Sequence, residues 1–165
     1  MTWTRAELEQ AFSDYQARVV TATETGDWSH FAASFTEDAT YVEHAYGNFA
    51  GREQIAAWAQ KTMTSFPATE MTAFPPTWST IDTERGWVIC EIANPMRDPG
   101  DGIVIAPANV TILRYGGEGL WREEEDVYNP MNFMADVTRW LRIAAAHDRL
   151  TDEARAWAAK FHIDL

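Results

Sequence analysis

The sequence is poor in cysteine, in basic residues and in long apolar runs, and each shortage excludes a class of protein. Its single cysteine, Cys90, cannot form an internal disulfide and has no CxxC or Cys/His spacing around it, so a disulfide scaffold and a structural zinc site are excluded. Thirteen basic residues against 25 acidic ones leave a net charge of −12, which opposes binding to nucleic acid and to anionic membranes. No stretch approaches the roughly 18 apolar residues of a membrane-spanning helix. The start Met1–Arg5 lacks the basic head and apolar run of a signal peptide, so we expect a cytoplasmic protein.

Several catalytic signatures are also missing. There is no glycine-rich phosphate loop, no GxSxG elbow, no HExxH helix and no cluster of Cys and His. We therefore expect neither a cofactor nor a metal.

The residues that are present describe one domain with a substantial core. A chain of 165 residues with 46% hydrophobic content needs no disulfide to fold, and we expect a single domain over residues 1–165. Eight Trp and eight Phe exceed what a minimal core needs. This surplus fits either an aromatic-lined pocket for a small apolar molecule or a broad dimer face.

The order of the elements is clearest between residues 26 and 55. Gly26 can end one helix in a left-handed turn, and Asp27 can cap the next. The spacing of the apolar residues and the positions of the β-branched residues predict the following order of helices and strands. Helices span 5–25 and about 28–35, a strand spans 40–44, and a third helix spans 52 to about 65.

Strand-like alternation follows Pro67, and helical spacing returns near the carboxyl end. Four antiparallel strands in a meander are predicted at residues 71–82, 86–96, 103–115 and 120–128. Pro75-Pro76 favours a bulge or an edge position in the first of them. Asn129-Pro130 begins a further helix, and Thr151 caps a last short one. These two extra helices, about residues 131–165, are expected to cover the cavity or to build a dimer.

These elements resemble the SnoaL-like branch of the nuclear transport factor two-like superfamily. The match rests on Gly26-Asp27, Phe35, Glu37-Asp38 and then Gly51-Arg52-Glu53 with Ile55. The resemblance implies an α+β, cone-shaped barrel in which three N-terminal helices pack on a curved, mostly antiparallel sheet, with a core at about residues 5–130. It also implies a homodimer. Because such folds carry many activities, the chemistry must be argued from the site.

The strand at residues 40–44 carries the first candidate acid and base. Tyr41 and Glu43 share one face of that strand, and His44 lies on the other. The same segment resembles ketosteroid isomerase. One alignment places Glu43 at the position of that enzyme's general base, and a one-residue gap places His44 there. Either group can abstract a proton from carbon, and the sequence leaves the choice open.

A second short match concerns hydrogen-bond donors. Ala106-Pro107-Ala108-Asn109 stands where ketosteroid isomerase carries Ala-Pro-Ile-Asp, so Asn109 is the counterpart of an oxyanion donor. The other donor of that enzyme, a tyrosine, corresponds to Val19 here, which argues against steroid isomerisation. Tyr15 lies one helical turn earlier on the same face and is a candidate substrate contact.

The last strand resembles the ending common in SnoaL-like proteins, and that resemblance implies an acid/base role for Asp126. Alternation puts Glu124, Asp126 and Tyr128 on one face, although three consecutive acids are typical of a solvated strand. Glu91 interrupts an apolar strand, and its parity with Trp87, Ile89 and Ala93 predicts an inward side chain. The expected substrate contacts are Tyr15, Tyr41, Trp58, Glu91 and Tyr128.

Three functions are compatible with these residues. The first is a cofactor-free cyclase, isomerase or lyase acting on an apolar, carbonyl-bearing substrate, with Glu43 or His44 as base, Asn109 as donor and Asp126 as acid. The second is a binding or dimerisation module without catalysis. The third is addition or removal of water, as in dehydratases and epoxide hydrolases. The Arg-x-Asp pattern of limonene epoxide hydrolase is absent, since Arg97 and Asp98 are adjacent.

Overall fold

The amino-terminal segment folds into two helices that meet at a glycine. The computed structural model describes residues 3–165, so the first two residues of the amino-terminal stretch considered above lie outside it. Helix α1, Arg5–Thr25, ends at Gly26, whose φ of 73° is left-handed and whose N–H donates to the Ala22 carbonyl. The Asp27 carboxylate then accepts from the Ser29 N–H at 3.0 Å, at the start of α2, Ser29–Ala32. The predicted helix junction is confirmed, but α2 is shorter than predicted because strand β1 already begins at Phe35.

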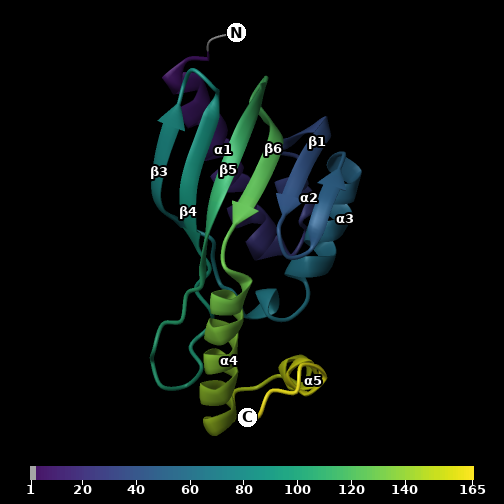
Figure 1. The fold of residues 1–165 in the computed structure, drawn as a ribbon, viewed down its shortest axis with the longest axis vertical. Coiled ribbons are helices and arrows are strands. Elements are labelled where there is room, and N and C mark those ends of the chain that lie inside the picture. Colours follow the sequence, from purple (N-terminus) through teal and green to yellow (C-terminus); the bar gives the residue numbers. More distant parts are fainter. Residues whose placement is uncertain (1–2) are drawn as a thin grey trace.

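A single six-stranded sheet forms the body of the molecule (Figure 1). Its order is β2-β1-β6-β5-β4-β3, and only the β1–β6 pair is parallel. The strands are β1 (Phe35–Glu43), β2 (Gly47–Ala50), β3 (Pro76–Asp82), β4 (Trp87–Ala93), β5 (Ala108–Gly117) and β6 (Leu120–Val127). The predicted meander of four antiparallel strands is confirmed as β3 to β6. The sequence did not predict β2.

Two of the predicted strands start later than expected. Strand β3 begins at Pro76, and Met71 makes only an isolated bridge to Met96. Strand β5 begins at Ala108, while Ile103 and Val104 are exposed in the preceding loop. In the first case the two prolines at 75 and 76 supply no N–H to a ladder, so regular pairing starts only after Pro75.

Helices α1, α2 and α3 (Arg52–Met63) lie on one face of the sheet, and the core fills the space between (Figure 1). Strand β4 shows which residues point inward: Val88, Cys90 and Ile92 are buried, and the residues between them are only partly buried. The prediction that Glu91 points inward is therefore wrong. The prediction relied on Glu91 sharing a face with the apolar residues Trp87, Ile89 and Ala93, but that face is the outer one. There Glu91 accepts a hydrogen bond from the Thr77 hydroxyl at 2.6 Å.

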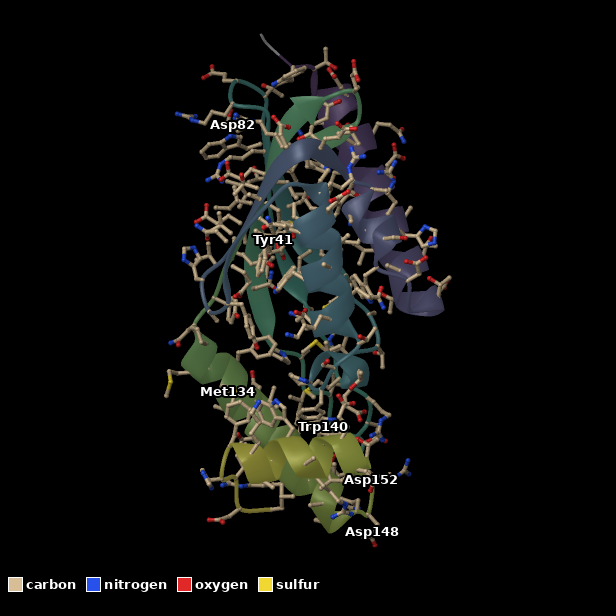
Figure 2. All side chains as sticks on the ribbon, turned by 90° about the vertical axis from the view of Figure 1, so that its right-hand side faces the viewer. Tyr41, Asp82, Met134, Trp140, Asp148 and Asp152 are labelled. Atoms are coloured by element: carbon tan, nitrogen blue, oxygen red, sulfur yellow. The ribbon has the colours of Figure 1, made fainter. Side chains whose placement is uncertain are left out.

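The two carboxyl-terminal helices form a second apolar cluster beyond one end of the sheet (Figures 1 and 2). Helix α4, Pro130–Ala146, is capped by Asn129, and helix α5, Asp152–Lys160, is capped by Thr151, so both predicted caps are confirmed. The buried residues of this cluster come from α4, from α5 and from the segments that follow α3 and β4: Phe66, Met96, Ile105, Val137, Trp140, Leu141, Ala144, Ala154 and Ala158.

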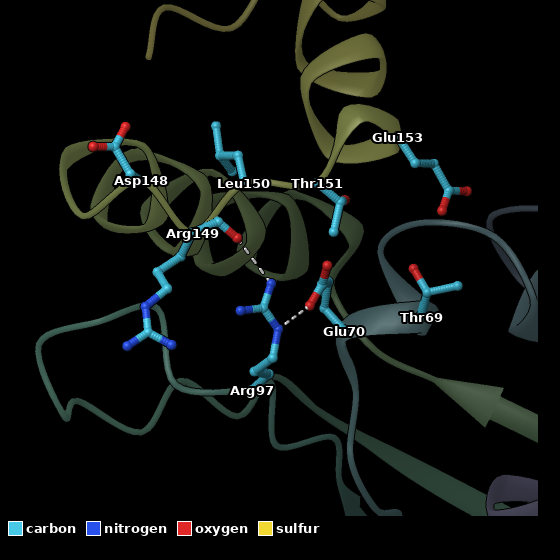
Figure 3. Close-up of a pocket in the computed structure, with 8 residues that line it drawn as sticks. All are labelled: Thr69, Glu70, Arg97, Asp148, Arg149, Leu150, Thr151 and Glu153. Atoms are coloured by element: carbon cyan, nitrogen blue, oxygen red, sulfur yellow. Dashed lines mark hydrogen bonds and ion pairs between the residues drawn. The ribbon is translucent and has the colours of Figure 1, made fainter.

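A polar clamp joins this cluster to the rest of the chain (Figure 3). Arg97 donates to the buried Glu70 carboxylate at 2.6 Å and to the Arg149 carbonyl at 3.0 Å, and Glu70 closes the short 3-10 helix η1, Ala68–Glu70. The Trp140 indole in turn donates to the Arg97 carbonyl at 2.7 Å. A cleft of about 600 Å³ opens beside this clamp.

None of the helices formed by residues 3–165 is both long and apolar enough to cross a bilayer.

Candidate functional site

Two carboxylates lie side by side on the inner face of β6. Because side chains alternate along a strand, Glu124 and Asp126 both face the helices, while Glu123 and Glu125 face outward and pair with Arg114. Glu124 is 2% exposed, and Asp126 is partly buried. Parallel pairing sets Glu124 opposite Tyr41 on β1. The site is thus built on two central, neighbouring strands.

Asp126 accepts hydrogen bonds on both oxygens. Its Oδ1 accepts from the Thr111 hydroxyl at 2.6 Å and from the Asn109 amide at 2.9 Å, both on β5. Its Oδ2 accepts from the Tyr41 hydroxyl at 2.5 Å. Asn94 holds Asn109 in place by donating to its Oδ1 at 3.0 Å. Three donors therefore fix this carboxylate and favour its charged form.

Glu124 has far fewer partners. The Tyr15 hydroxyl, from α1, donates to its Oε1 at 3.0 Å. Its other oxygen, Oε2, is buried and has no hydrogen-bond partner among residues 3–165. No Lys, Arg or His in the described part of the chain hydrogen-bonds to either acid of the pair.

The environments of the two acids push them toward different protonation states. Burial raises the pKa of Glu124 well above its usual range and the negative charge of Asp126 raises it further, while the hydroxyls of Tyr15 and Tyr41 lower it in part. Burial also raises the pKa of Asp126, and the negative charge of Glu43 adds to this; hydrogen bonds from Thr111, Tyr41 and Asn109 lower the pKa and oppose these effects, but the net shift is upward. We infer that, of the two acids, Glu124 is the one that holds a proton and Asp126 is the one that carries a negative charge. Burial raises the pKa of Tyr15 and of Tyr41, so both hydroxyls stay protonated as donors.

The structure also shows which of Glu43 and His44 faces the interior. Glu43 is 4% exposed on the inner face, and its Oε2 accepts from the backbone N–H groups of Ala45 and Tyr46 at 2.9 and 2.6 Å. It thereby closes the turn between β1 and β2. The His44 side chain is half exposed on the outer face, where its Nε2 lies 3.0 Å from Glu125 Oε1. Of the two expected bases, only Glu43 points into the interior. Its carboxylate already accepts the hydrogen bonds that close the β1–β2 turn.

The expected substrate contacts lie in three different places. Tyr15 and Tyr41 hydrogen-bond to the acid pair, and the Trp58 ring lies 4.5 Å from the Tyr41 ring, centroid to centroid. Tyr128 lies further along toward α4, where its ring contacts Phe133 at 5.5 Å, and burial raises its pKa. The remaining residue, Glu91, lies outside this interior.

Sequence reasoning missed Glu124, Thr111 and Asn94. The alternation of side chains along the strand correctly placed Glu124 on the same face as Asp126. Four consecutive acids at 123–126 are typical of a solvent-exposed strand, however, so Glu124 was not predicted as a site residue. The signal that separates the two cases is Arg114 on β5, which pairs with the two outward acids and leaves the inward pair without a cation. Thr111 and Asn94 carry no sequence signal of a site.

Two other features do not mark the site. The cleft beside Glu70 and Arg97, and another along α4, contain neither acid of the pair. Among residues 3–165, no three His, Cys, Asp or Glu side chains are grouped to hold a metal ion. We place the candidate site at the acid pair because buried carboxyl groups whose pKa is shifted by burial and by a neighbouring charge concentrate at functional sites.

Comparison with known proteins identifies relatives of this architecture. A family model described as SnoaL-like domain matches residues 4–160. No curated protein matches the sequence. A protein from Catenulispora acidiphila with a ketosteroid isomerase-like fold, solved with trimethylamine, is 23% identical with a TM-score of 0.59, covering 77% of this chain and 91% of its own.

Two further solved structures share the fold at lower identity. An LEH-like epoxide hydrolase from M. tuberculosis is 12% identical with a TM-score of 0.63, covering 86% of this chain and 96% of its own. A putative polyketide cyclase from Xanthomonas campestris is 16% identical with a TM-score of 0.60, covering 80% and 97%. At such identities the likeness concerns the fold alone, and it confirms the expected α+β architecture.

Proposed function

This chain belongs to the SnoaL-like domain family, and from that premise we propose that it is a small-molecule enzyme that catalyses proton transfer on an apolar substrate without a cofactor. The observation that carries the proposal is the acid pair on β6. Glu124 and Asp126 share one buried face, and Asp126 accepts from three donors on both oxygens whereas Glu124 accepts from one donor on one oxygen. Two carboxyl groups held in different protonation states supply one acid and one base at the same pH.

The roles follow from the hydrogen bonds of each group. Asp126 acts as the base and removes a proton from a carbon next to a carbonyl group. The electron pair of that C–H bond forms a carbon–carbon double bond, and the carbonyl π pair moves onto the oxygen, which needs a neutral donor. In a substrate whose enolate is conjugated with a second carbon–carbon double bond, return of the proton from Asp126 to the far carbon of that system re-forms the carbonyl group and gives an isomer. Attack of the enolate carbon on a second carbonyl group closes a ring, and the alkoxide formed there takes the proton from Asp126.

Asn109 and Tyr15 have different roles in this proposal from those expected from sequence. Asn109 was expected to donate to a substrate oxygen, and Tyr15 was expected to contact the substrate. In the structure the Asn109 amide donates to Asp126 and to Thr111, and the Tyr15 hydroxyl donates to Glu124. We assign them as positioning residues that fix the two acids. Glu43 stays at the edge of the site as the carboxylate that closes the β1–β2 turn.

Turnover by an Asp126→Asn variant tests the proposal. Aromatic polyketides, terpenoids and steroids form the substrate panel. On any compound that is converted, we expect Asp126→Asn to lower kcat by about 10²- to 10⁴-fold, the usual contribution of a general base. Glu125→Gln, which changes the next acid on the outer face of the same strand, should retain kcat within about twofold. Full turnover by Asp126→Asn would remove Asp126 from the mechanism.

A second candidate function is binding of a small amine without chemistry. The Catenulispora acidiphila relative was solved with trimethylamine. Here the Tyr41 and Trp58 rings lie beside a carboxylate that has no cationic partner among residues 3–165, an arrangement that suits an ammonium group. Calorimetric titration with trimethylamine separates the two functions. Tight binding that is lost in Asp126→Asn, with no turnover on the panel, would favour the binding function.

A further inference from the structure

Two buried polar atoms without a partner belong to residues that lie next to Tyr41. Glu124 Oε2 and the Trp58 indole nitrogen each lack a hydrogen bond within residues 3–165. The Trp58 ring packs on the Tyr41 ring. Tyr41 lies opposite Glu124 in the β1–β6 pair, where its hydroxyl lowers the pKa of the Glu124 carboxyl group. Buried polar groups are normally paired, so unpaired ones at a candidate site indicate where a ligand atom belongs.

In the neutral acid, the free oxygen of Glu124 is a donor rather than an acceptor. The Tyr15 hydroxyl donates to Oε1, which leaves Oε2 to carry the proton of the neutral acid. The titratable groups that face this carboxyl group are Tyr15 from α1, Tyr41 from β1, Cys90 from β4 and Asp126 from its own strand. None of them carries a positive charge that would stabilise a carboxylate. Burial accordingly raises the pKa of Glu124 well above its usual range.

We propose that the Oε2–H group of Glu124, assisted by the Trp58 indole N–H, binds the acceptor oxygen of a neutral substrate, such as the carbonyl oxygen of a ketone or aldehyde. This inference rests on the proposed function and names its substrate class. Glu124 is then the neutral donor that stabilises the oxygen while Asp126 removes the proton from carbon.

The same geometry disfavours anionic substrates. A carboxylate or phosphate placed beside Glu124 would lie next to the negative charge of Asp126. No Arg, Lys or His of the described chain hydrogen-bonds at this point to offset that repulsion. In a buried site such repulsion is poorly screened.

Matched ligands test this assignment by calorimetry. The probes are 2-acetylnaphthalene, a neutral ketone, and 2-naphthoate, an anion of similar size. We expect the ketone to bind at least tenfold more tightly than the anion at neutral pH. Glu124→Leu should weaken ketone binding about tenfold or more. Glu124→Gln, which keeps a neutral N–H donor, should retain most of the affinity, and Glu123→Gln on the outer face should leave it unchanged.

Infrared difference spectroscopy gives a readout that does not depend on turnover. Adding the ketone should shift the C=O stretch of a protonated carboxyl group, and this band should be missing in Glu124→Gln. Stronger binding of the anion, unchanged ketone affinity in a folded Glu124→Leu variant, absence of the protonated-carboxyl band, or failure of the ketone to bind would each overturn the inference.

The outcomes separate this inference from the proposed function. If Asp126→Asn abolishes turnover but the Glu124 band is missing, the enzyme proposal stands and the substrate-class inference fails. If the ketone binds through Glu124 but no compound of the panel is converted, the inference stands as a binding site and the proposed catalysis fails.

Discussion

At the scale of single residues, the central feature is a carboxyl group that the fold keeps away from water without giving it a cation. Glu124 is 2% exposed and hydrogen-bonds through one oxygen to Tyr15. Ionising it requires a charge to be buried next to Asp126, and burial of an unpaired charge is unfavourable. The free energy of unfolding must therefore depend on the protonation of this one residue.

That dependence gives a prediction with a definite sign. The pKa of Glu124 in the folded state is raised above its ordinary value of 4.5, so above pH 4.5 the folded state binds more protons than the unfolded state. The free energy of unfolding should then fall as pH rises, by up to about 1.4 kcal/mol per pH unit until the folded pKa is passed. Glu124→Gln removes this term. Relative to wild type, the variant should gain stability between pH 5 and pH 8 in urea titrations.

Glu123→Gln is the control for this measurement. It removes a carboxylate from the same strand but from the outer face, where Glu123 pairs with Arg114. Its stability difference from wild type should not grow with pH in the way described for Glu124→Gln. A constant difference between Glu124→Gln and wild type across this range would show that Glu124 is not held protonated.

At the scale of elements, local chemistry sets the ends of most helices. Gly26, Asn129 and Thr151 each mark a helix end with the backbone conformation or side-chain bond that their residue type favours. These positions were predictable because capping depends on residues close in sequence. Strand β2 was not predictable, because residues 47–50 have little strand character and pair only once β1 is in place.

The helix end at Gly26 provides a prediction at this scale. Its φ is 73°, and no atom lies within 4 Å of where a Cβ would be, so the cost of a side chain is conformational rather than steric. Gly26→Ala should lower the free energy of unfolding by about 1–2 kcal/mol, measured by urea titration. Gly26→Asn should cost less, since asparagine adopts left-handed backbone more readily. Equal stability of Gly26→Ala and wild type would show that this turn does not hold the α1–α2 junction.

Strand β6 shows what the alternation of side chains along a strand can and cannot predict. It correctly placed Glu124 and Asp126 on one face and Glu123 and Glu125 on the other. It could not say which face is buried, because that depends on what packs against the strand. For Glu91 the same reasoning failed, since apolar residues lie on both faces of β4.

At the scale of the whole molecule, residues 3–165 form two apolar clusters rather than one. The first lies between the sheet and helices α1 to α3, and the second surrounds α4 and α5. Within the second cluster, the Arg97 clamp ties the segments that follow α3 and β4 to α4 and to the α4–α5 loop, through Glu70, the Arg149 carbonyl and Trp140. We expect the second cluster to lose its structure more easily than the sheet, because it is smaller and lies at one end.

Trp140→Ala tests this expectation. Trp140 is fully buried, its indole donates to the Arg97 carbonyl, and the Arg97 guanidinium lies 5.3 Å from its ring. Truncation should cost about 3–5 kcal/mol. In hydrogen-exchange measurements α4 and α5 should lose protection, while β4, β5 and β6 keep theirs. Trp157→Ala, at a partly exposed position of the same cluster, should have a smaller effect, and equal loss of protection in the sheet would show a single cooperative unit.

The sequence by itself determined the elements that depend on neighbours along the chain: the helix caps, the meander of β3 to β6, and the alternation that groups Glu124 with Asp126. Only the tertiary structure decided which face of β6 is buried, that Glu43 rather than His44 turns inward, and that Tyr15 and Tyr41 reach the two acids from α1 and β1. The physical reason is burial. The protonation state of a carboxyl group depends on the water and charges removed from around it, and these are set by residues as far apart in sequence as Tyr15 and Glu124.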